Sequence, residues 1–369
     1  MQIISRTFDN VNINRLKHTI MKSRRGFIAD LSLLGGATLL SGCSTATNTN
    51  KEQSSESTLS EKVKMAMLAM QRASWEQGTA IQAAVEGNDL MMLHLLVTEA
   101  ILRQSADGRT CMLGSSSNVT DPIAAGPGIM KCYELTGLQK YKDAADRLYQ
   151  YCKTEAPRNA EGTVYHLNNR RELWSDSIYM LPPFLAAYGD HDDCMKQLRG
   201  YRNVLWNKDK NLYAHRWSDD RNAFVNPKCW GGGNGWAMAS FAIVYELLPD
   251  NLPDYKKEVS SYLQELTEGL MPHLRADGLF HDIVDEADSF VETNLSQMAA
   301  FGIYKGIRLG IIEAAYLPHA NKMRAAATSK IDKYGYVQDA CGSPNFKAAG
   351  TSTEAQAFYL MMEAEYGKR

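Results

Sequence analysis

Apolar and polar positions follow two different helical patterns along the chain after residue 58. Segments such as 139–155 and 254–274 place apolar residues at i, i+3 and i+4 among charged ones, which is the spacing of an amphipathic helix. Other segments are apolar almost all round, which is typical of buried helices. Strand-type alternation is scarce, apart from short pieces near Tyr213 and Phe280. The pattern therefore predicts an all-α fold.

Six of the apolar segments resemble one another. Each opens with polar or small residues and continues with apolar ones, and several end at glycine. The openings recur at steps of 46, 55, 58, 59 and 60 residues, near Trp75, Asp121, Asp176, Asn234, Thr293 and Thr353. Such a step fits one hairpin of two helices, each of roughly 15 to 20 residues, with its loops. Six hairpins predict a closed (α/α)6 barrel over residues 59–369, with the apolar helices inside and the charged helices outside.

Polar side chains gather at the predicted openings of the inner helices. Alternating helices run antiparallel, so all inner helices of such a barrel begin at the same mouth. Helix N-termini also favour anions, through free N–H groups and the macrodipole. With Trp75, Trp174, Trp230 and Trp236 nearby, the mouth suits a sugar that carries a carboxylate. Its predicted polar residues are Glu76, Gln77, Asp121, Asp176, Asn234, Glu292, Thr293, Thr353 and Glu354.

Each of these residues also has a structural interpretation. Asp121, Asp176, Thr293 and Thr353 could each cap a helix, because short polar side chains are common at that position. The tryptophans could belong to the core. Convergence on one mouth favours a binding site, since helix caps do not require tryptophans.

The N-terminal residues carry a different signal. Residues 21–43 contain Arg24 and Arg25, a modest apolar run and the ending Leu40-Ser41-Gly42-Cys43. This order resembles a twin-arginine export signal that ends in a bacterial lipobox, which implies lipidation of Cys43. The alternative is a cytoplasmic start with a chance pair of arginines.

The signal predicts where the protein resides. Met21 suits such a signal better as a start than Met1, so residues 1–20 are interpreted as a misassigned extension of the 1–43 signal. Residues 44–58 are polar and predict a flexible tether. Ser44 after the lipidated cysteine favours the outer membrane. We therefore expect an exported protein that is lipid-anchored to that membrane through Cys43 and faces the periplasm.

Composition narrows the function classes. The 369 residues are 44% hydrophobic and 22% charged with a formal net charge of −2, so the basic footprint of a nucleic-acid-binding protein is missing. The cysteines form no CxxC pair, so a zinc site is not expected. No other metal and no organic cofactor is implied. Proteins exported by the twin-arginine route fold before export, so buried free thiols are expected instead of disulfides. They are Cys111, Cys132, Cys152, Cys194, Cys229 and Cys341.

Several motifs, in this order, carry a family resemblance. They are RASWEQGT, TDPIAAGPGIMKCYELTG, LWSDSIYMLPPFL, LYAHRW, CWGGGNGWAMASFAIVYELLP, GLFHDIVDEADSFVETNLSQMAAFGIYKGIRLG and GTSTEAQAF. Over most of residues 65–366 the chain resembles the unsaturated glycuronyl hydrolases of glycoside hydrolase families 88 and 105. The closer match is family 105, the unsaturated rhamnogalacturonyl hydrolases.

The resemblance implies a reaction and a substrate. The substrate is a lyase-generated oligosaccharide, of rhamnogalacturonan or ulvan type, with a 4,5-unsaturated uronic acid at its non-reducing end. A carboxylic acid protonates C4, water adds at C5, and the hemiketal that forms opens and breaks the glycosidic bond.

The resemblance also implies roles for individual residues. Asp176 would be the general acid/base and Asp121 the second carboxylate. Trp174 and the apolar stretch behind Asp176, together with Asp121, are expected to raise the pKa of Asp176. Pro182 and Pro183 are expected to bend or restart the helix behind it. The residues expected to bind substrate are Trp75, His166, Trp174, His215, Arg216, Trp230, Asn234 and Trp236, although both histidines could also be surface loop residues.

Position 232 departs from the family pattern. Many members read WGRGNGW, whereas this chain reads WGGGNGW, so Gly232 stands where an arginine would approach the substrate carboxylate. Either another cation, Arg216 or Arg171, holds that carboxylate, or the substrate differs.

Two other functions stay open at this point. A different (α/α)6 sugar enzyme, such as an epimerase or an inverting glycosidase, would also use two acids. A non-catalytic glycan-binding surface lipoprotein would keep the tryptophans but would not need Asp176. The presence of both acids favours the unsaturated glycuronyl hydrolase.

Overall fold

The computed structural model describes residues 57–369. The predicted signal at 1–43, the lipidation at Cys43 and nearly all of the tether at 44–58 therefore lie outside the described residues. None of the helices in the described part combines the length and the apolar character that a membrane span requires. All six cysteines of this part are buried and free, as the sequence predicted.

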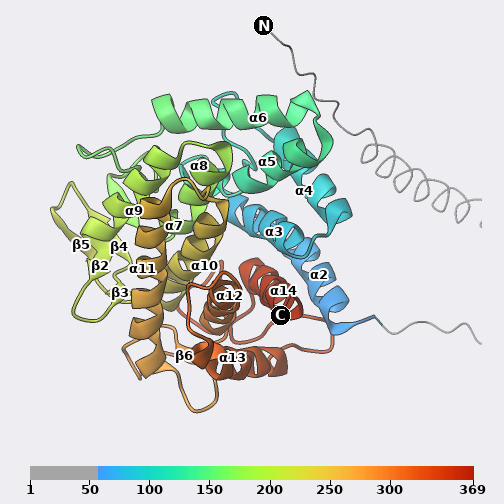
Figure 1. Ribbon diagram of the computed structural model, residues 1–369, viewed down its shortest axis with the longest axis vertical. Helices are drawn as coiled ribbons and strands as arrows, with labels where there is room; N and C mark the ends of the chain where they lie inside the picture. Colours follow the sequence, from blue (N-terminus) through green and yellow to red (C-terminus); the bar gives the residue numbers. More distant parts are fainter. Residues whose placement is uncertain (1–56) are drawn as a thin grey trace, which may run out of the picture. The chain divides into compact units, whose positions relative to one another are not determined.

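The inner helices of residues 57–369 form a ring (Figure 1). Each packs on the next, and the last packs back on the first, which closes the ring. In chain order they are α3 (Ser74–Glu86), α5 (Gly126–Thr136), the pair α7 (Ser177–Met180) and α8 (Pro182–Tyr188), α10 (Gly231–Leu247), α12 (Asn294–Arg308) and α14 (Thr353–Gly367).

An outer layer of helices covers this ring. The outer helices are α2 (Leu59–Met70), α4 (Leu90–Leu102), α6 (Gln139–Gln150), α9 (His191–Leu205), α11 (Pro253–Leu270) and α13 (Leu317–Ser329). From α4 onward, each packs on the inner helix that precedes it, and α2 packs on α14, so the first and last described helices complete the final hairpin. The predicted (α/α)6 barrel is confirmed. Short helical turns lie at Asp121–Ile123 (η1), Tyr151–Glu155 (η2), Met271–His273 (η3) and Ala314–Tyr316 (η4).

Side-chain size explains which helices lie inside. The inner helices α10 and α12 bury nearly every residue, whereas the outer helix α6 buries one face. Small residues let the inner elements approach closely. A Cβ added at Gly78 on α3 would lie 2.4 Å from the Cβ of Ala124, the residue after η1.

Gly78→Ala should therefore destabilise the barrel. Overpacking of this kind costs about 1–3 kcal/mol of unfolding free energy, to be measured by urea denaturation. Gly367→Ala is the matched control, because it also lies in a helix and a Cβ there would meet nothing within 4 Å. Equal stability of the two variants would contradict this account of the packing.

Short strands accompany the helices, and two pairs of them lie where the sequence indicated strand-type pieces. The pieces near Tyr213 and Phe280 are β3 (Leu212–Tyr213), paired with β2 (Trp206–Asn207), and β6 (Phe280–His281), paired with β7 (Val291–Glu292). A three-stranded antiparallel sheet also joins β1 (Glu172–Trp174), β4 (Arg216–Ser218) and β5 (Ala223–Asn226). Strands of three or four residues are too short to show alternation. This sheet places Trp174 opposite Arg216, just before α7 begins.

The helix-cap interpretation fails for all four residues to which it was applied. Asp176 precedes α7, but its side chain caps no backbone N–H, and Asp121 is the first residue of η1 without capping it. Thr293 donates its hydroxyl to the Gln338 carbonyl, and Ser352, not Thr353, caps α14. As predicted, the inner helix restarts at Pro182, after α7 ends at Met180. The two aspartates are therefore available for chemistry.

Candidate active site

A cavity of about 160 Å³ lies where the inner helices begin. The fold brings together seven of the residues predicted to act in catalysis or to bind substrate, and five other side chains complete the wall. The predicted residues are Trp75, Asp121, His166, Trp174, Asp176, Trp230 and Trp236. The additional ones are Asn118, Leu167, Met180, Phe346 and Glu354.

Asp176 pairs with a histidine from another part of the chain. Its Oδ2 lies 3.5 Å from Nε2 of His215, and neither atom has a hydrogen-bond partner among residues 57–369. The amide of Asn226 donates to Nδ1 of His215 over 3.2 Å, which leaves the ring proton on Nε2, facing the carboxylate. Burial raises the pKa of Asp176, but His215 and His166 outweigh burial and hold the pKa below its ordinary value. The prediction that the pKa of Asp176 is raised is wrong.

The raised pKa belongs to Asp121. Its Oδ2 accepts a hydrogen bond of 2.6 Å from the amide of Asn118, and its Oδ1 lies 3.6 Å from Nε2 of His166. Burial, and then the charges of Asp176 and Glu354, raise the pKa of Asp121 well above its ordinary value. Burial lowers the pKa of His166 to about 4, so this imidazole is neutral at pH 7. Like charges in one buried site cannot both form easily, and the opposite directions of the two pKa shifts favour the proton on Asp121.

The tryptophans are held by their neighbours. The Trp174 ring stacks on His166, with centroids 4.2 Å apart and planes 13° apart, and the Arg216 guanidinium lies 4.5 Å from the Trp174 centroid. Since a ring stacked this closely fills one face, the guanidinium lies over the other. Trp174 therefore presents an edge to the cavity and not a flat platform. Trp230 packs at 4.6 Å against His215, which keeps that imidazole beside Asp176.

Three predicted substrate-binding residues, His215, Asn234 and Arg216, are not part of the cavity wall, and of these His215 contacts Asp176. The Asn234 side chain is fully engaged with backbone: it accepts from the Tyr213 N–H and donates to the carbonyls of Tyr213 and Trp230. Arg216 contacts Trp174 instead of lining the cavity. The alternative cation, Arg171, is exposed and lies 3.5 Å from Asp220. Both histidines belong to the site and are not surface loop residues.

Glu354 is the acid to which sequence reasoning gave no role. It lies in the first turn of α14, is 4% exposed, and lines the cavity. Burial, and then the charge of Glu76, raise its pKa to about 8. Its place at the start of an otherwise apolar inner helix had put it among the predicted polar residues of the mouth, by the same signal that identified Asp176, but without a role.

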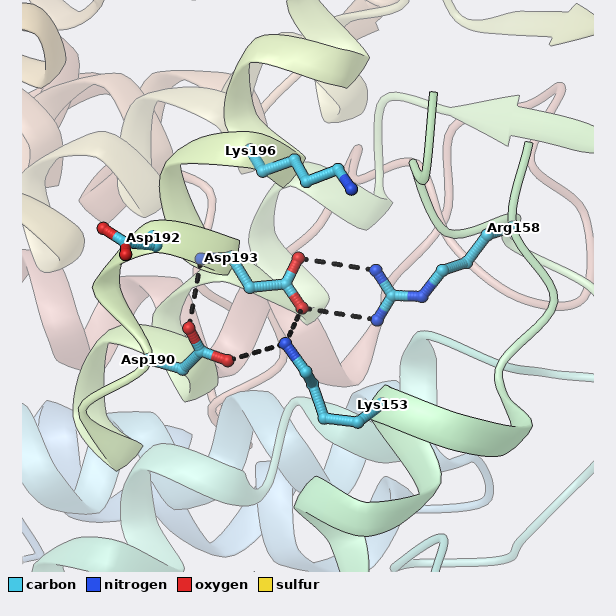
Figure 2. A pocket seen from close by; sticks show the side chains of 6 residues that line it. All are labelled: Lys153, Arg158, Asp190, Asp192, Asp193 and Lys196. Carbon is cyan, nitrogen blue, oxygen red and sulfur yellow. Dashed lines mark hydrogen bonds and ion pairs between the residues drawn. The ribbon is translucent and has the colours of Figure 1, made fainter. Parts of the chain in front are cut away.

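A second cavity, of about 420 Å³, is lined by charged residues between η2 and α9 (Figure 2). Lys153 donates to Asp190 over 2.9 Å and to Asp193 over 3.0 Å, and Arg158 also contacts Asp193. These charges neutralise one another and tie η2 to the start of α9. We interpret this cluster as structural. Among residues 57–369, no cluster of histidine, cysteine and acidic residues could hold a metal ion.

Comparisons with known proteins identify the family of this chain. A family model described as "Glycosyl Hydrolase Family 88" matches residues 46–366. The unsaturated rhamnogalacturonyl hydrolase YesR of Bacillus subtilis is 25% identical over 228 residues, which cover 58% of this chain and 64% of YesR. An unsaturated 3S-rhamnoglycuronyl hydrolase of an Alteromonas species is 25% identical over 167 residues, which cover 40% of this chain and 39% of that enzyme. The chain thus spans less than two thirds of the length of these relatives.

Solved structures share the fold. A "possible member of GH105 family" from Salmonella enterica superposes with a TM-score of 0.74 at 19% identity, covering 84% of this chain and 93% of that one. An unsaturated glucuronyl hydrolase specific for heparin superposes with a TM-score of 0.63 at 12% identity, covering 84% of this chain and 97% of that one. These structures confirm the barrel architecture.

Proposed function

Because the chain belongs to glycosyl hydrolase family 88, we propose that it removes a 4,5-unsaturated uronic acid from the non-reducing end of lyase-generated oligosaccharides. One observation carries the proposal: two carboxyls, the buried Asp121 and the partly buried Asp176, line one tryptophan-rich cavity, and their pKa values are displaced in opposite directions. Sites that separate the pKa values of two acids in this way are typical of acid–base catalysis. The names of the relatives support the substrate class, with rhamnogalacturonan- or ulvan-type oligosaccharides as the proposed sources.

In the proposed reaction Asp176 acts as the general acid and base. It gives its proton to C4 of the enol ether and then takes one from the water that adds at C5, after which the hemiketal opens. Asp176 is ionised without substrate, so this carboxylate must take up a proton when the substrate binds. A bound uronate adds a negative charge and displaces water, and both effects raise the pKa of a carboxyl. Asp121 keeps its own proton and orients the sugar.

This loading predicts two different pH profiles. The fall of kcat/KM with rising pH reports Asp176 in the free protein, whereas the fall of kcat reports it in the complex. We expect the kcat profile to fall at a pH at least about one unit higher, because binding raises the pKa of Asp176. Steady-state rates from about pH 2.5 to 9 measure both profiles. If the kcat and kcat/KM profiles fell at the same pH, substrate binding would not protonate Asp176.

The decisive experiment uses matched pairs of disaccharides. Purified protein from residue 44 onward is incubated with unsaturated disaccharides from several polysaccharide lyases, and with the saturated counterpart of each. We expect the ultraviolet absorbance of the double bond to disappear and mass spectrometry to detect the freed sugar, with the saturated partners intact. Cleavage of saturated partners would instead indicate an ordinary glycosidase, and binding without turnover would indicate a glycan-binding protein.

We also propose that the protein is exported and lipid-anchored through Cys43. What supports this is the order of Arg24 and Arg25, the apolar run and the Leu40-Ser41-Gly42-Cys43 ending. Cys43→Ala should shift the protein from the membrane fraction to the soluble fraction and abolish labelling with a radioactive fatty acid. An unchanged distribution would contradict the anchor.

A further inference from the structure

An anionic sugar needs a partner for its carboxylate, and this cavity offers no basic side chain for it. Within the described part of the chain, no lysine or arginine lines the cavity, and three of its lining residues are acids. Replacing Gly232 by a basic residue would not by itself supply a cation. A Cβ there would lie 2.5 Å from Cζ2 of Trp230, so the indole ring occupies the space in which a side chain would begin.

Nearby basic residues are directed elsewhere. The Arg216 guanidinium lies on Trp174, and its Nε is 3.8 Å from Oε2 of Glu172. His166 is neutral at pH 7, and Nε2 of His215 faces Asp176. The partner of the substrate carboxylate must therefore come from another group in the cavity wall.

Glu354 has the geometry for this contact. It lines the cavity, it is 4% exposed, and its Oε2 is buried without a hydrogen-bond partner among residues 57–369. The charged groups that influence it are all acids: Glu76 on α3, Glu292 before α12, and Asp121 on η1. Burial and these neighbours favour the neutral carboxylic acid, which can donate a hydrogen bond, as an ionised carboxylate cannot.

We propose that Glu354, as a neutral acid, donates a hydrogen bond to the carboxylate of the unsaturated uronic acid and so replaces an arginine in recognising this end of the substrate. The inference rests on the proposed function. A bond from a carboxylic acid to a carboxylate is charge-assisted and short, so one proton held between the two groups offsets the repulsion that two carboxylates would feel. The site then selects anionic sugars as long as Glu354 keeps its proton.

Proton-linked binding has a measurable signature. Because the pKa of Glu354 is raised to about 8, affinity for the uronide should hold below pH 8 and weaken above it. The expected slope is about tenfold in Kd per pH unit, the dependence of one bound proton. Calorimetry in the Asp176→Asn background removes turnover and the titration of Asp176. The probe is an unsaturated disaccharide that the parent enzyme consumes, titrated at pH 6.5 to 9.5.

Matched variants separate Glu354 from the alternatives. Adding Glu354→Gln, whose amide donates at every pH, should leave a Kd that changes less than about threefold over this range. Adding Arg216→Gln should keep the full pH dependence. The methyl ester of the same disaccharide should bind the Asp176→Asn protein without pH dependence, since it carries no negative charge.

The outcomes are distinct from those of the proposed function. If the parent consumes a disaccharide but the Kd in the Asp176→Asn background does not change with pH, the role of Glu354 is overturned while the hydrolase activity stands. A Kd without pH dependence that weakens at least about tenfold at pH 6.5 with Arg216→Gln would assign the carboxylate to Arg216 and overturn the inference as well. If the parent consumes no unsaturated disaccharide, the proposed function fails first and this inference fails with it.

Discussion

Replacing Asp176 by asparagine should lower kcat on an unsaturated disaccharide by about 10²- to 10⁴-fold, which is the contribution of a positioned proton donor. Asparagine keeps the shape of the side chain but cannot protonate C4. The substitution also leaves Nε2 of His215, 3.5 Å away, without the charge that it faces. The expected loss is therefore in the chemical step, with substrate binding retained. Initial rates at saturating substrate measure it.

Two comparisons make this result interpretable. Asp288→Asn changes an exposed acid and should keep the parent rate, and the unfolding midpoint of the Asp176 variant should show that it is folded. Asp121→Asn tests which acid donates the proton. If Asp121→Asn lost the larger factor while Asp176→Asn stayed within about tenfold of the parent, the two carboxyls would exchange roles.

Replacing Lys305 by methionine should cost about 3–5 kcal/mol of unfolding free energy, as expected when one partner of a buried ion pair is removed. Lys305 on α12 is 0% exposed, and its ammonium lies 2.9 Å from Glu86, 2.5 Å from Glu246 and 3.4 Å from Glu365. These acids lie near the ends of α3, α10 and α14, so one lysine joins four inner helices at the end of the barrel opposite the site. Methionine fills a similar volume but removes the buried charge, and leaves the three carboxylates with only Arg308 and Lys368 as cationic partners.

The pH dependence of this cost has a definite sign. Burial raises the pKa of Glu365, but Arg308 and Lys305 outweigh it and hold the pKa at about 2. A depressed carboxyl pKa stabilises the fold above the unfolded value of about 4.3, and this contribution is lost as the pH falls toward 2. The difference between parent and variant should therefore be full at pH 7 and shrink below about pH 4.

Urea denaturation at pH 7 and below about pH 4 measures the difference in unfolding free energy between the parent and Lys305→Met. Lys257→Met, on the exposed face of α11, is the matched control and should change stability by less than about 0.5 kcal/mol. If the Lys305→Met protein were as stable as this control, the buried ion cluster would contribute nothing to the unfolding free energy of the barrel.

The barrel could be predicted from local pattern alone. The contrast between helices apolar all round and helices apolar on one face depends on the residues of each segment, and the recurring openings set the number of hairpins. The same pattern brought Asp121, Asp176 and the tryptophans to one mouth, because inner helices of such a barrel must all begin at the same end. The three-stranded sheet escaped prediction, since its strands are too short for a periodic signal.

Tertiary structure alone decided how the charges of the site are distributed. Burial predicts a raised pKa for any acid in this cavity, but His215, which reaches Asp176 through the sheet, reverses the direction there and leaves the proton on Asp121. Asn234 carries the same sequence signal as the aspartates, yet its amide is used by the backbone of Tyr213 and Trp230. The sequence determines which groups lie at the mouth. Their protonation and their free hydrogen-bonding capacity depend on solvation and pairing, which neighbours that are distant along the chain decide.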